Sequence, residues 1–294
     1  MTPALQDIIR LLDVEKIEEN LFRGMNVPDN PHVFGGQVLA QAIAAADRTL
    51  DETRRLHSLH AYFLRPGDWK AKTLYQVDRI RDGKSFTTRR VAAIQHGRAI
   101  FSMSASWHKE EDGLEHAVPM PDVPPPQSLR SQQDVMAEAL KDKPELKRQS
   151  ERFNAIEIRQ VENYQMTDNE RHPPYRHTWV RAADALPDDP EVHVCMLAYI
   201  SDMDFMGTSM LPHGRGFGSE RRIQGASLDH AMWFHRDFRA DEWLLFAKSS
   251  PSAAGARGFV RGQFFNEQGE LIATAAQECL IRPRDGVLPE SERG

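Results

Sequence analysis

The chain has 294 residues, enough for two domains of ordinary size, each able to bury a core without a metal or a disulfide. Hydrophobic residues make up 40% and charged residues 27%, and no uninterrupted apolar stretch approaches the ~20 residues that a membrane helix needs. The net charge of -6 argues against general nucleic-acid binding, and the two cysteines have neither the spacing of metal ligands nor the number that a disulfide framework requires.

The first half of the chain predicts one long helix followed by strands. Residues 34–50, FGGQVLAQAIAAADRTL, are rich in alanine and repeat apolar side chains at helical spacing. A strand follows in HSLHAYFLRPG. Residues 81–107, RDGKSFTTRRVAAIQHGRAIFSMSASW, are rich in β-forming residues and have His96-Gly97 in the middle, which predicts two long antiparallel strands joined by a tight turn.

A proline-rich and charged segment separates the two halves. PMPDVPPP, residues 119–126, predicts an extended spacer because proline lacks the backbone N–H that helices and sheets use. The charged run DVMAEALKDKPELKRQSERF predicts a short surface helix, and IEIRQVEN from Ile156 predicts a strand. We therefore expect an N-terminal domain over residues 1–120, a linker over 121–155 and a C-terminal domain over 156–294 that carries the catalytic residues.

The second half repeats the order of the first. Residues 253–279, AAGARGFVRGQFFNEQGELIATAAQEC, align without gaps with residues 81–107, so that Arg89 meets Arg261. ASLDHAMWFHRDF predicts a helix capped by Ser227, and WLLFAKSS predicts the strand after it. The expected fold is α+β, with an antiparallel sheet wrapped around one long helix, made twice. The two sheets could join edge to edge, which would hide exposed edge strands.

Polar side chains interrupt the apolar pattern of the second half. AYISDMDF reads as a strand in which Asp202 and Asp204 share one face, where a carboxylate is costly unless it is paired or functional. Gln277 lies in the last strand, where the first repeat has Ala105, and Ser227 lies at the predicted helix start. A carboxylate, an amide and a hydroxyl can hold and deprotonate a water, and the N–H groups of a helix start can polarise a carbonyl. The alternative is a polar cluster that only ties sheet to helix, and the pattern leaves both open.

Signatures of other chemistries are weak. The chain has no GxxxxGK[ST] phosphate loop and no GxSxG nucleophile elbow, since GASLD at residues 225–229 lacks the second glycine. His230 would point away from Ser227 on a regular helix, and it is five residues from His235, a poor spacing for a metal pair. Both cysteines lie in apolar runs. We therefore expect no metal, no organic cofactor and no catalytic thiol.

Five motifs carry a family resemblance: VFGGQVLAQA, HSLHAYFLRPGD, RDGKSFTTRRVAAIQ, LDHAMWFHRDF and ARGFVRGQFF. With them the chain resembles the type II acyl-CoA thioesterases, the bacterial TesB-like enzymes and their peroxisomal relatives, over nearly its whole length. The resemblance implies a double-hotdog fold, two tandem hotdog repeats, and hydrolysis of fatty acyl-CoA to free fatty acid and CoA. It places the family's catalytic aspartate at Asp202, its hydroxyl residue at Ser227, often threonine in the family, and its glutamine at Gln277. Spacing alone does not rank Asp202 above Asp204.

The expected substrate contacts follow from the chemistry of an acyl-CoA. The acyl tail should follow an apolar channel along the helices, and arginines should bind the CoA phosphates. The expected contacts are Phe34, Gly35, Gly36, Val38, Met232, Trp233 and Arg257, with Arg65, Arg89 and Arg261 as further candidates. For each apolar residue the alternative is ordinary core packing. The matching repeat positions of Arg89 and Arg261 favour a structural role for that pair.

The remaining expectations concern partners, location and rival functions. We expect a homo-oligomer, a dimer or tetramer, with no nucleic-acid partner and no membrane insertion. The first 20 residues carry acidic side chains where a signal peptide needs an apolar run, so the expected location is cytoplasmic. One rival is a hydroxyacyl dehydratase, which needs a histidine and a carboxylate facing one substrate carbon. The other is a non-catalytic acyl-CoA binding protein.

Overall fold

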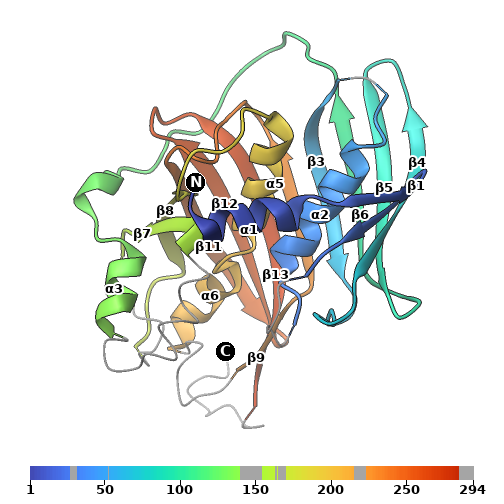
Figure 1. The fold of residues 1–294 in the computed structure, drawn as a ribbon. Coiled ribbons are helices and arrows are strands. Elements are labelled where there is room, and N and C mark those ends of the chain that lie inside the picture. The colour runs from blue at the N-terminus through green and yellow to red at the C-terminus, as the bar shows by residue number, and fades with distance from the viewer. Residues whose placement is uncertain are drawn as a thin grey trace.

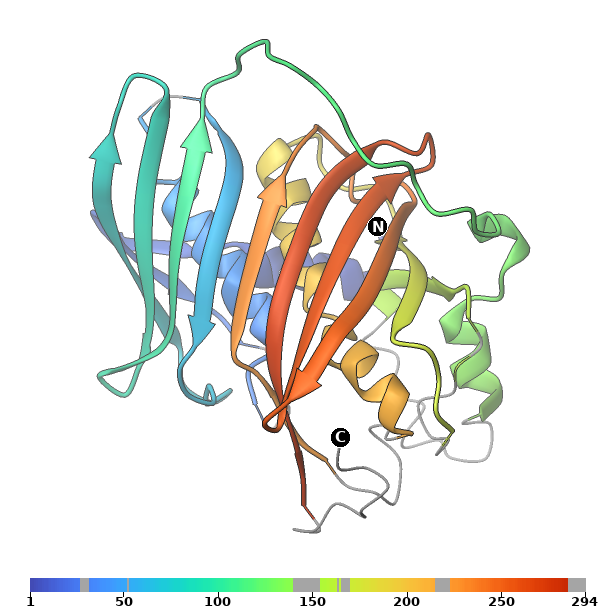
Figure 2. The same cartoon turned by 180° about the vertical axis from the view of Figure 1, so that it is seen from behind.

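One large antiparallel sheet dominates the computed structural model, which describes residues 1–26, 32–51, 53–139, 154–162, 164, 170–214 and 223–284. Helices cover one face of this sheet, and the view from behind looks onto the other face (Figures 1 and 2). The elements of the first half are α1 (Pro3–Leu12), β1 (Glu15–Glu18), β2 (Leu21–Gly24), α2 (Gly35–Asp47), β3 (Arg55–Phe63), β4 (Thr73–Asp82), β5 (Phe86–Gln95) and β6 (Arg98–His108).

The connection and the second half follow. The connection contains η1 (Pro126–Ser128) and α3 (Gln132–Ala139). The second half contains β7 (Ile156–Gln160), β8 (Tyr175–Ala182), α5 (Pro190–Ser201), α6 (Phe205–Met210), η3 (Leu211–His213), β9 (Ile223–Ser227), β10 (Asp229–Phe234), β11 (Leu244–Ala254), β12 (Arg257–Asn266) and β13 (Leu271–Pro283).

The two halves have matching topologies that meet at a central seam. The strand order across the sheet is β1-β2-β4-β5-β6-β3-β10-β13-β12-β11-β8-β7, and β9 pairs with β13 beyond β10. At the seam β3 pairs with β10, where His60 lies opposite Ala231. The predicted edge-to-edge joining is therefore confirmed, and it hides one edge strand of each half.

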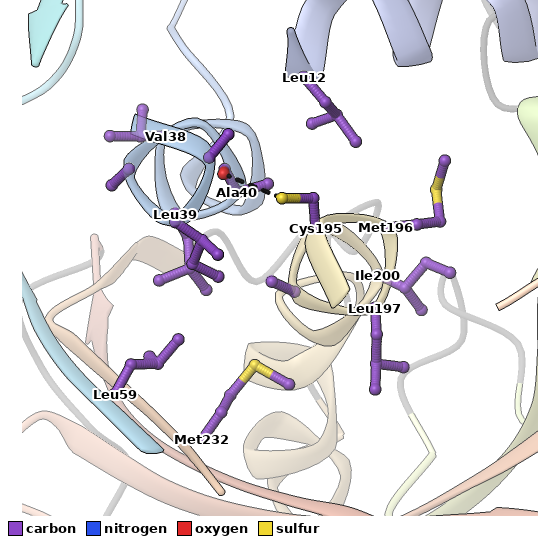
Figure 3. Close-up of a cluster of buried hydrophobic side chains, with 14 of the residues drawn as sticks. Leu12, Val38, Leu39, Ala40, Leu59, Cys195, Met196, Leu197, Ile200 and Met232 are labelled. Atoms are coloured by element: carbon purple, nitrogen blue, oxygen red, sulfur yellow. Dashed lines mark hydrogen bonds between the residues drawn. The ribbon is translucent and has the colours of Figure 1, made fainter. Parts of the chain in front are cut away.

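The long helices α2 and α5 pack against each other on the covered face of the sheet (Figure 3). Cys195 Sγ on α5 donates to the backbone oxygen of Ala40 on α2 at 3.5 Å, an approach that the small alanine side chains of α2 permit. Leu59 from β3 and Met232 from β10 close this core on the sheet side, and neither has exposed surface. The two halves therefore share one core across the seam.

Most of the predicted elements are confirmed. The helix expected over residues 34–50 is α2, and the hairpin expected over residues 81–107 is β5 and β6. His96 and Gly97 have φ values of 49° and 71°, the left-handed conformation that a two-residue hairpin turn of this kind requires. Residues 119–125 form no regular element, in agreement with a spacer, and the charged run after them begins as α3. The rest of that run, residues 140–153, lies outside the described residues.

The prediction of the second long helix was wrong. ASLDHAMWFHRDF forms the end of β9 and all of β10, because β10 has hydrogen-bonded neighbours on both sides and its burial alternates with a period of two. The helix of this half is α5, in a segment whose end was read as a strand. Its continuous apolar run VCMLAYI has no periodicity that separates a helix from a buried strand. The overlooked signal is its start, where Asp189 caps the helix and Pro190 follows.

The gapless repeat alignment is also wrong by one residue in β12. Arg89 lies opposite Ala105 in the first hairpin, whereas Val260, not Arg261, lies opposite Gln277 in the second. The cause is the turn, which has two residues between Gln95 and Arg98 but three between Asn266 and Glu270. Ala105 and Gln277 therefore remain equivalent, while buried Arg89 corresponds to Val260 and Arg261 is exposed.

Candidate active site

Three predicted catalytic side chains meet in one hydrogen-bonded group. Asp202 follows the last residue of α5, Ser227 ends β9, and Gln277 lies in β13. Ser227 Oγ donates to Asp202 Oδ1 at 3.1 Å, and Gln277 Nε2 donates to Ser227 Oγ at 2.9 Å. The structure brings the three residues together, although Asp202 was expected on a strand and Ser227 at a helix start; their catalytic roles stay a prediction.

A bulge in the strand edge brings Ser227 to Gln277. Ser227 lies opposite Cys279, and Ala231 lies opposite Ala276, so the β9–β10 side uses four steps where β13 uses three. Leu228 sits in this irregular stretch and remains bonded on both sides, donating to Glu278 O and accepting from Phe63 N. Such bulges redirect a side chain next to a site, and here the redirected side chain is Ser227.

The helix start at this site is that of α2 in the first half; no helix begins at Ser227, contrary to the prediction. The backbone N–H of Gly36, in the first turn of α2, donates to Asp202. A Cβ on Gly35 would lie 2.5 Å from Asp202 Oδ2, and one on Gly36 would lie 2.5 Å from the backbone oxygen of Tyr199. Only glycine permits this approach, so α2 of one half and α5 of the other build the site together.

Burial and hydrogen bonding oppose each other at Asp202. Burial raises the pKa of this carboxyl from its ordinary 3.8 to about 6, and the bonds from Ser227, Gln277 and Gly36 hold it from rising further. The Asp202 and Ser227 side chains are nevertheless only partly buried. The carboxyl therefore titrates close to neutral pH and stays within reach of water, the two properties that a general base needs.

Asp204 has a different environment from Asp202. It precedes α6 with a left-handed φ of 57°. Its Oδ2 lies 2.6 Å from Arg176 Nη1 and 3.4 Å from Lys248 Nζ, and both cations are almost fully buried. Burial alone would raise the pKa of Asp204, but Lys248 and Arg176 lower it below its ordinary value. The prediction that Asp202 and Asp204 share a strand face was wrong, and Asp204 is committed to an ion pair.

His230 joins the group from its buried side, which the sequence interpretation missed. Its Nδ1 lies 2.5 Å from Gln277 Oε1 and its Nε2 lies 2.9 Å from Ser201 Oγ. The side chain has no exposed surface, and burial lowers the pKa of His230 to about 4. On the strand β10, His230 lies two residues before Met232, so both side chains point to the face that the helices cover. Strand periodicity was thus the signal that could have placed it here.

The corresponding place in the first half is filled. Asp47 ends α2 much as Asp202 follows α5, but Trp107 donates its indole N–H to Asp47 Oδ1 at 2.9 Å. The residue two positions before Trp107 is Ala105, which cannot replace the amide of Gln277.

The start of α5 also differs from that of α2. α5 begins with Pro190, which has no N–H, and with Glu191. Burial and the charge of Asp47 raise the pKa of Glu191 to about 7. A helix start without a glycine pair and with an added carboxylate is a poor place for a developing oxyanion.

The predicted substrate contacts lie in several environments. Phe34 precedes α2 and meets Tyr199 edge to face at 5.0 Å between ring centroids. Val38 and Met232 are buried in the shared core (Figure 3). Trp233 faces the other side of β10, where its ring lies 5.3 Å from that of His60. Met232 and Trp233 therefore cannot line one channel.

The candidate arginines are also dispersed. Arg257 is exposed and its Nε lies 2.9 Å from Glu278 Oε1. Arg65 is exposed beside Ala99 O, and Arg261 is exposed beside Ser249. Arg89 has no exposed surface and is bonded to Thr49 and Asp82, so it cannot reach a bound CoA; the other bonded atoms are Arg81 O and Thr88 O.

Both thiols are buried, and burial raises the pKa of each, to about 12 for Cys279. Within the described ranges no three histidine, cysteine, aspartate or glutamate side chains are placed to bind a metal ion. In the same part of the chain, no helix has the length and apolar character to cross a membrane.

Comparison with known proteins gives one consistent result. The family model for the acyl-CoA thioesterase matches residues 149–280, and that for the acyl-CoA thioesterase N-terminal domain matches residues 26–108. Acyl-coenzyme A thioesterase 8 from Mus musculus is 40% identical over 287 residues, covering 94% of this chain and 88% of that protein. The crystal structure of acyl-CoA thioesterase II TesB2 from Mycobacterium marinum aligns with a TM-score of 0.79 and 42% identity, covering 95% of this chain and 100% of that one.

A more distant likeness concerns the fold alone. A conserved protein of unknown function with a hot dog fold, from Alicyclobacillus acidocaldarius, aligns with a TM-score of 0.77 at 17% identity, covering 96% of this chain and 99% of that one.

Proposed function

The chain belongs to the type II acyl-CoA thioesterases, thioester hydrolases with a double-hotdog fold, and we propose that it hydrolyses fatty acyl-CoA with a water held by Asp202, Ser227 and Gln277. One observation carries this proposal: the three side chains are hydrogen-bonded to one another beside the start of α2. The named relatives, which are acyl-CoA thioesterases, support an acyl-CoA as the substrate.

Asp202 acts as the general base. Above its pKa of about 6 the carboxylate accepts a proton from the attacking water, while Ser227 and Gln277 orient that water by hydrogen bonds. The water oxygen forms a bond to the thioester carbonyl carbon, and the π electron pair of the carbonyl moves to its oxygen. Because the base transfers a proton directly from water, no covalent intermediate on the protein is needed.

The start of α2 stabilises the oxyanion. N–H groups in the first helical turn have no partner within the helix, and the dipole places partial positive charge there. When the tetrahedral intermediate collapses, its C–S bond breaks and CoA leaves as a thiolate. The proton held by Asp202 then neutralises that thiolate, which leaves free acid, CoA and a regenerated carboxylate. A thiolate is a good leaving group, so no strong general acid is required.

The acyl tail should begin beside the aromatic side chains around Gly35. A Cβ on Gly35 would lie 2.9 Å from the Phe63 ring, and Phe34 and Tyr199 pack together next to it. These three rings are partly buried, whereas Val38 and Met232 lie deeper in the core. We place the first carbons of the tail against the rings and any longer tail toward Val38. Arg257 remains a candidate contact of the CoA phosphates.

We assign one active site to each chain. Trp107 and Ala105 occupy the place in the first half where a second site would need an amide and room for a water. The homo-oligomer and the cytoplasmic location remain predictions from the sequence.

The test is turnover of palmitoyl-CoA, followed by a colorimetric thiol reagent in buffer without added metal. Release of one thiol per substrate, abolished in Asp202→Asn and reduced in Ser227→Ala and Gln277→Ala, is the expected result. Tight binding without thiol release would favour the acyl-CoA binding protein. Hydration of an enoyl-CoA without thiol release would favour the dehydratase.

A further inference from the structure

We propose that His230 is a positioning residue of this active site, whose Nδ1–H holds the Gln277 amide in the orientation that presents Nε2 to Ser227 and Asp202. The proposal rests on the proposed function, because it assumes that Gln277 orients the attacking water. His230 would fix that amide from its buried side.

The contacts of His230 are fully enclosed. The imidazole has no exposed surface and Gln277 is 1% exposed. The ring lies between Gln277 Oε1, 2.5 Å from Nδ1, and Ser201 Oγ, 2.9 Å from Nε2. The Phe205 ring packs at 5.8 Å between centroids. No solvent molecule can replace a lost partner on this side without a new cavity.

The charge of Asp202 sets the direction of every bond in this chain of contacts. A carboxylate only accepts, so the Ser227 hydroxyl must donate to Asp202 Oδ1. The Ser227 oxygen is then the acceptor for Gln277, which must turn its NH₂ group toward it. Gln277 Oε1 consequently faces His230 and can only accept. Nδ1 of His230 must therefore carry the proton, and its Nε2 is left as an acceptor. The single hydroxyl proton of Ser201 then points to Nε2, at 2.9 Å, rather than to the backbone oxygen of Ala198, at 2.8 Å.

His230 removes an ambiguity that the shape of Gln277 leaves. The two ends of a side-chain amide are nearly equal in size, so packing alone accepts either orientation. In the reversed orientation Oε1 would face the Ser227 oxygen and the Asp202 carboxylate, which would lose a donor and gain a repulsive neighbour. A fixed donor behind Oε1 makes the productive orientation the stable one.

The imidazole is suited to this role because it stays neutral. Burial lowers the pKa of His230 to about 4, although the bond to Gln277 acts in the other direction. Among the described residues, Ser201 and Phe205 also contact His230, and both are uncharged. Cys279 Sγ lies 3.3 Å from Gln277 Nε2, and its raised pKa keeps it a neutral thiol. A neutral histidine in a neutral setting keeps one tautomer across the working pH range.

The first test measures the tautomer directly. In full-length protein labelled with ¹⁵N-histidine, the chemical shifts of His230 should report a protonated Nδ1 and a bare Nε2 between pH 7 and 8, where Asp202 is ionised. The His230→Asn variant identifies the signal. This readout does not depend on turnover, so it separates a failure of this proposal from a failure of the proposed function. A protonated Nε2 with a bare Nδ1 would overturn the proposal, since Gln277 Oε1 would then have no donor.

The second test compares two substitutions of His230 with a matched one at His235. Asparagine can place an N–H near the position of Nδ1, whereas leucine fills the space without a donor. We expect His230→Leu to lower kcat at least tenfold with KM changed less than twofold, and to move the acid limb of the kcat–pH profile to higher pH. His230→Asn should recover most of both.

His235→Leu is the control, because His235 bonds Thr274 and not Gln277. It should leave kcat and the pH profile unchanged. Equal losses in His230→Leu and His230→Asn, or a lowered melting temperature in His230→Leu with normal kcat and pH profile, would overturn the positioning role. If both tests succeed while Asp202→Asn retains full activity, the positioning of Gln277 stands and the general-base assignment fails.

Discussion

Replacing Asp202 and Asp204 separately with asparagine should give opposite phenotypes. Asp202→Asn keeps the size of the side chain but cannot take a proton from water, and a positioned general base contributes about 10²–10⁴ in rate, or roughly 3–5 kcal/mol. In the wild-type protein, the ionised carboxylate of Asp202 also lowers the free energy of unfolding. Raising the pKa from 3.8 to about 6 corresponds to roughly 3 kcal/mol, which applies once the pH exceeds 6. We therefore expect kcat to fall by that factor, with an unchanged or higher melting temperature at pH 7.5.

Asp204→Asn should damage stability instead. Asp204 pairs with Arg176 and Lys248, whose side chains are 2% and 1% exposed. Removing its charge leaves two buried cations without a counter-charge, and breaking a buried pair from one side costs about 3–5 kcal/mol. At roughly 2–4 °C per kcal/mol, the melting temperature should fall on the order of 10 °C. The lowered pKa of Asp204 gives the sign: its contribution is present above the ordinary value and is lost as pH falls through the folded value.

The assay is steady-state hydrolysis of palmitoyl-CoA at 15 °C, where both variants should remain folded, together with thermal unfolding followed by circular dichroism. The wild-type protein and both variants are measured at pH 7.5. If Asp204→Asn is inactive while folded and Asp202→Asn retains normal kcat, the assignment of the base is wrong. If neither variant loses kcat, the polar cluster is structural and the water-holding mechanism fails.

Four further outcomes are expected. Gly35→Ala should lower kcat at least tenfold, because its Cβ would lie 2.5 Å from Asp202 Oδ2, whereas Gly113→Ala, with nothing within 4 Å, should have no effect; equal activities would contradict the close approach. Activity should decline about tenfold per pH unit below about 6 as Asp202 becomes protonated, so a plateau that persists to pH 4 would exclude Asp202 as the base. Turnover should survive EDTA and iodoacetamide because both thiols are buried with raised pKa values; zinc-dependent recovery after EDTA would refute this, and Cys279→Ala controls for steric effects of alkylation. Titration with a non-hydrolysable acyl-CoA analogue should saturate at one equivalent per chain, and two equivalent sites would contradict the inference that Trp107 occupies the place of a second site in the first half.

Local sequence patterns predicted an element correctly where the segment itself contained the spacing or the turn residues that define that element. The alanine-rich helix α2 and the β5–β6 hairpin were predicted because helical spacing and a His-Gly turn act over a few residues. The equivalence of Ala105 and Gln277 survived because the gapless alignment stays in register after the turn, from Arg98 and Glu270 onward. Arg261 was misplaced because one extra residue in the second turn shifts β12 against it.

The sequence predicted a helix where β10 lies and a strand at the end of α5, and these two errors mark the limit of local patterns. Both segments are apolar and short, so their periodicity does not choose between helix and strand. β10 becomes a strand because β3 of the other half and β13 supply its hydrogen bonds from both sides. α5 becomes a helix because α2, distant in sequence, covers its apolar surface.

The sequence by itself determined the family, the two-repeat architecture and the residue types of the site, because these follow from motifs and from the asymmetry between two copies. Only the tertiary structure decided how those residues are arranged. It separated Asp202 from Asp204 by giving the second its buried cations, and it brought the α2 start and His230 to the site. These relations depend on contacts between residues tens to more than a hundred positions apart. Such contacts form when apolar surfaces of both halves are buried together, a choice that no local pattern encodes.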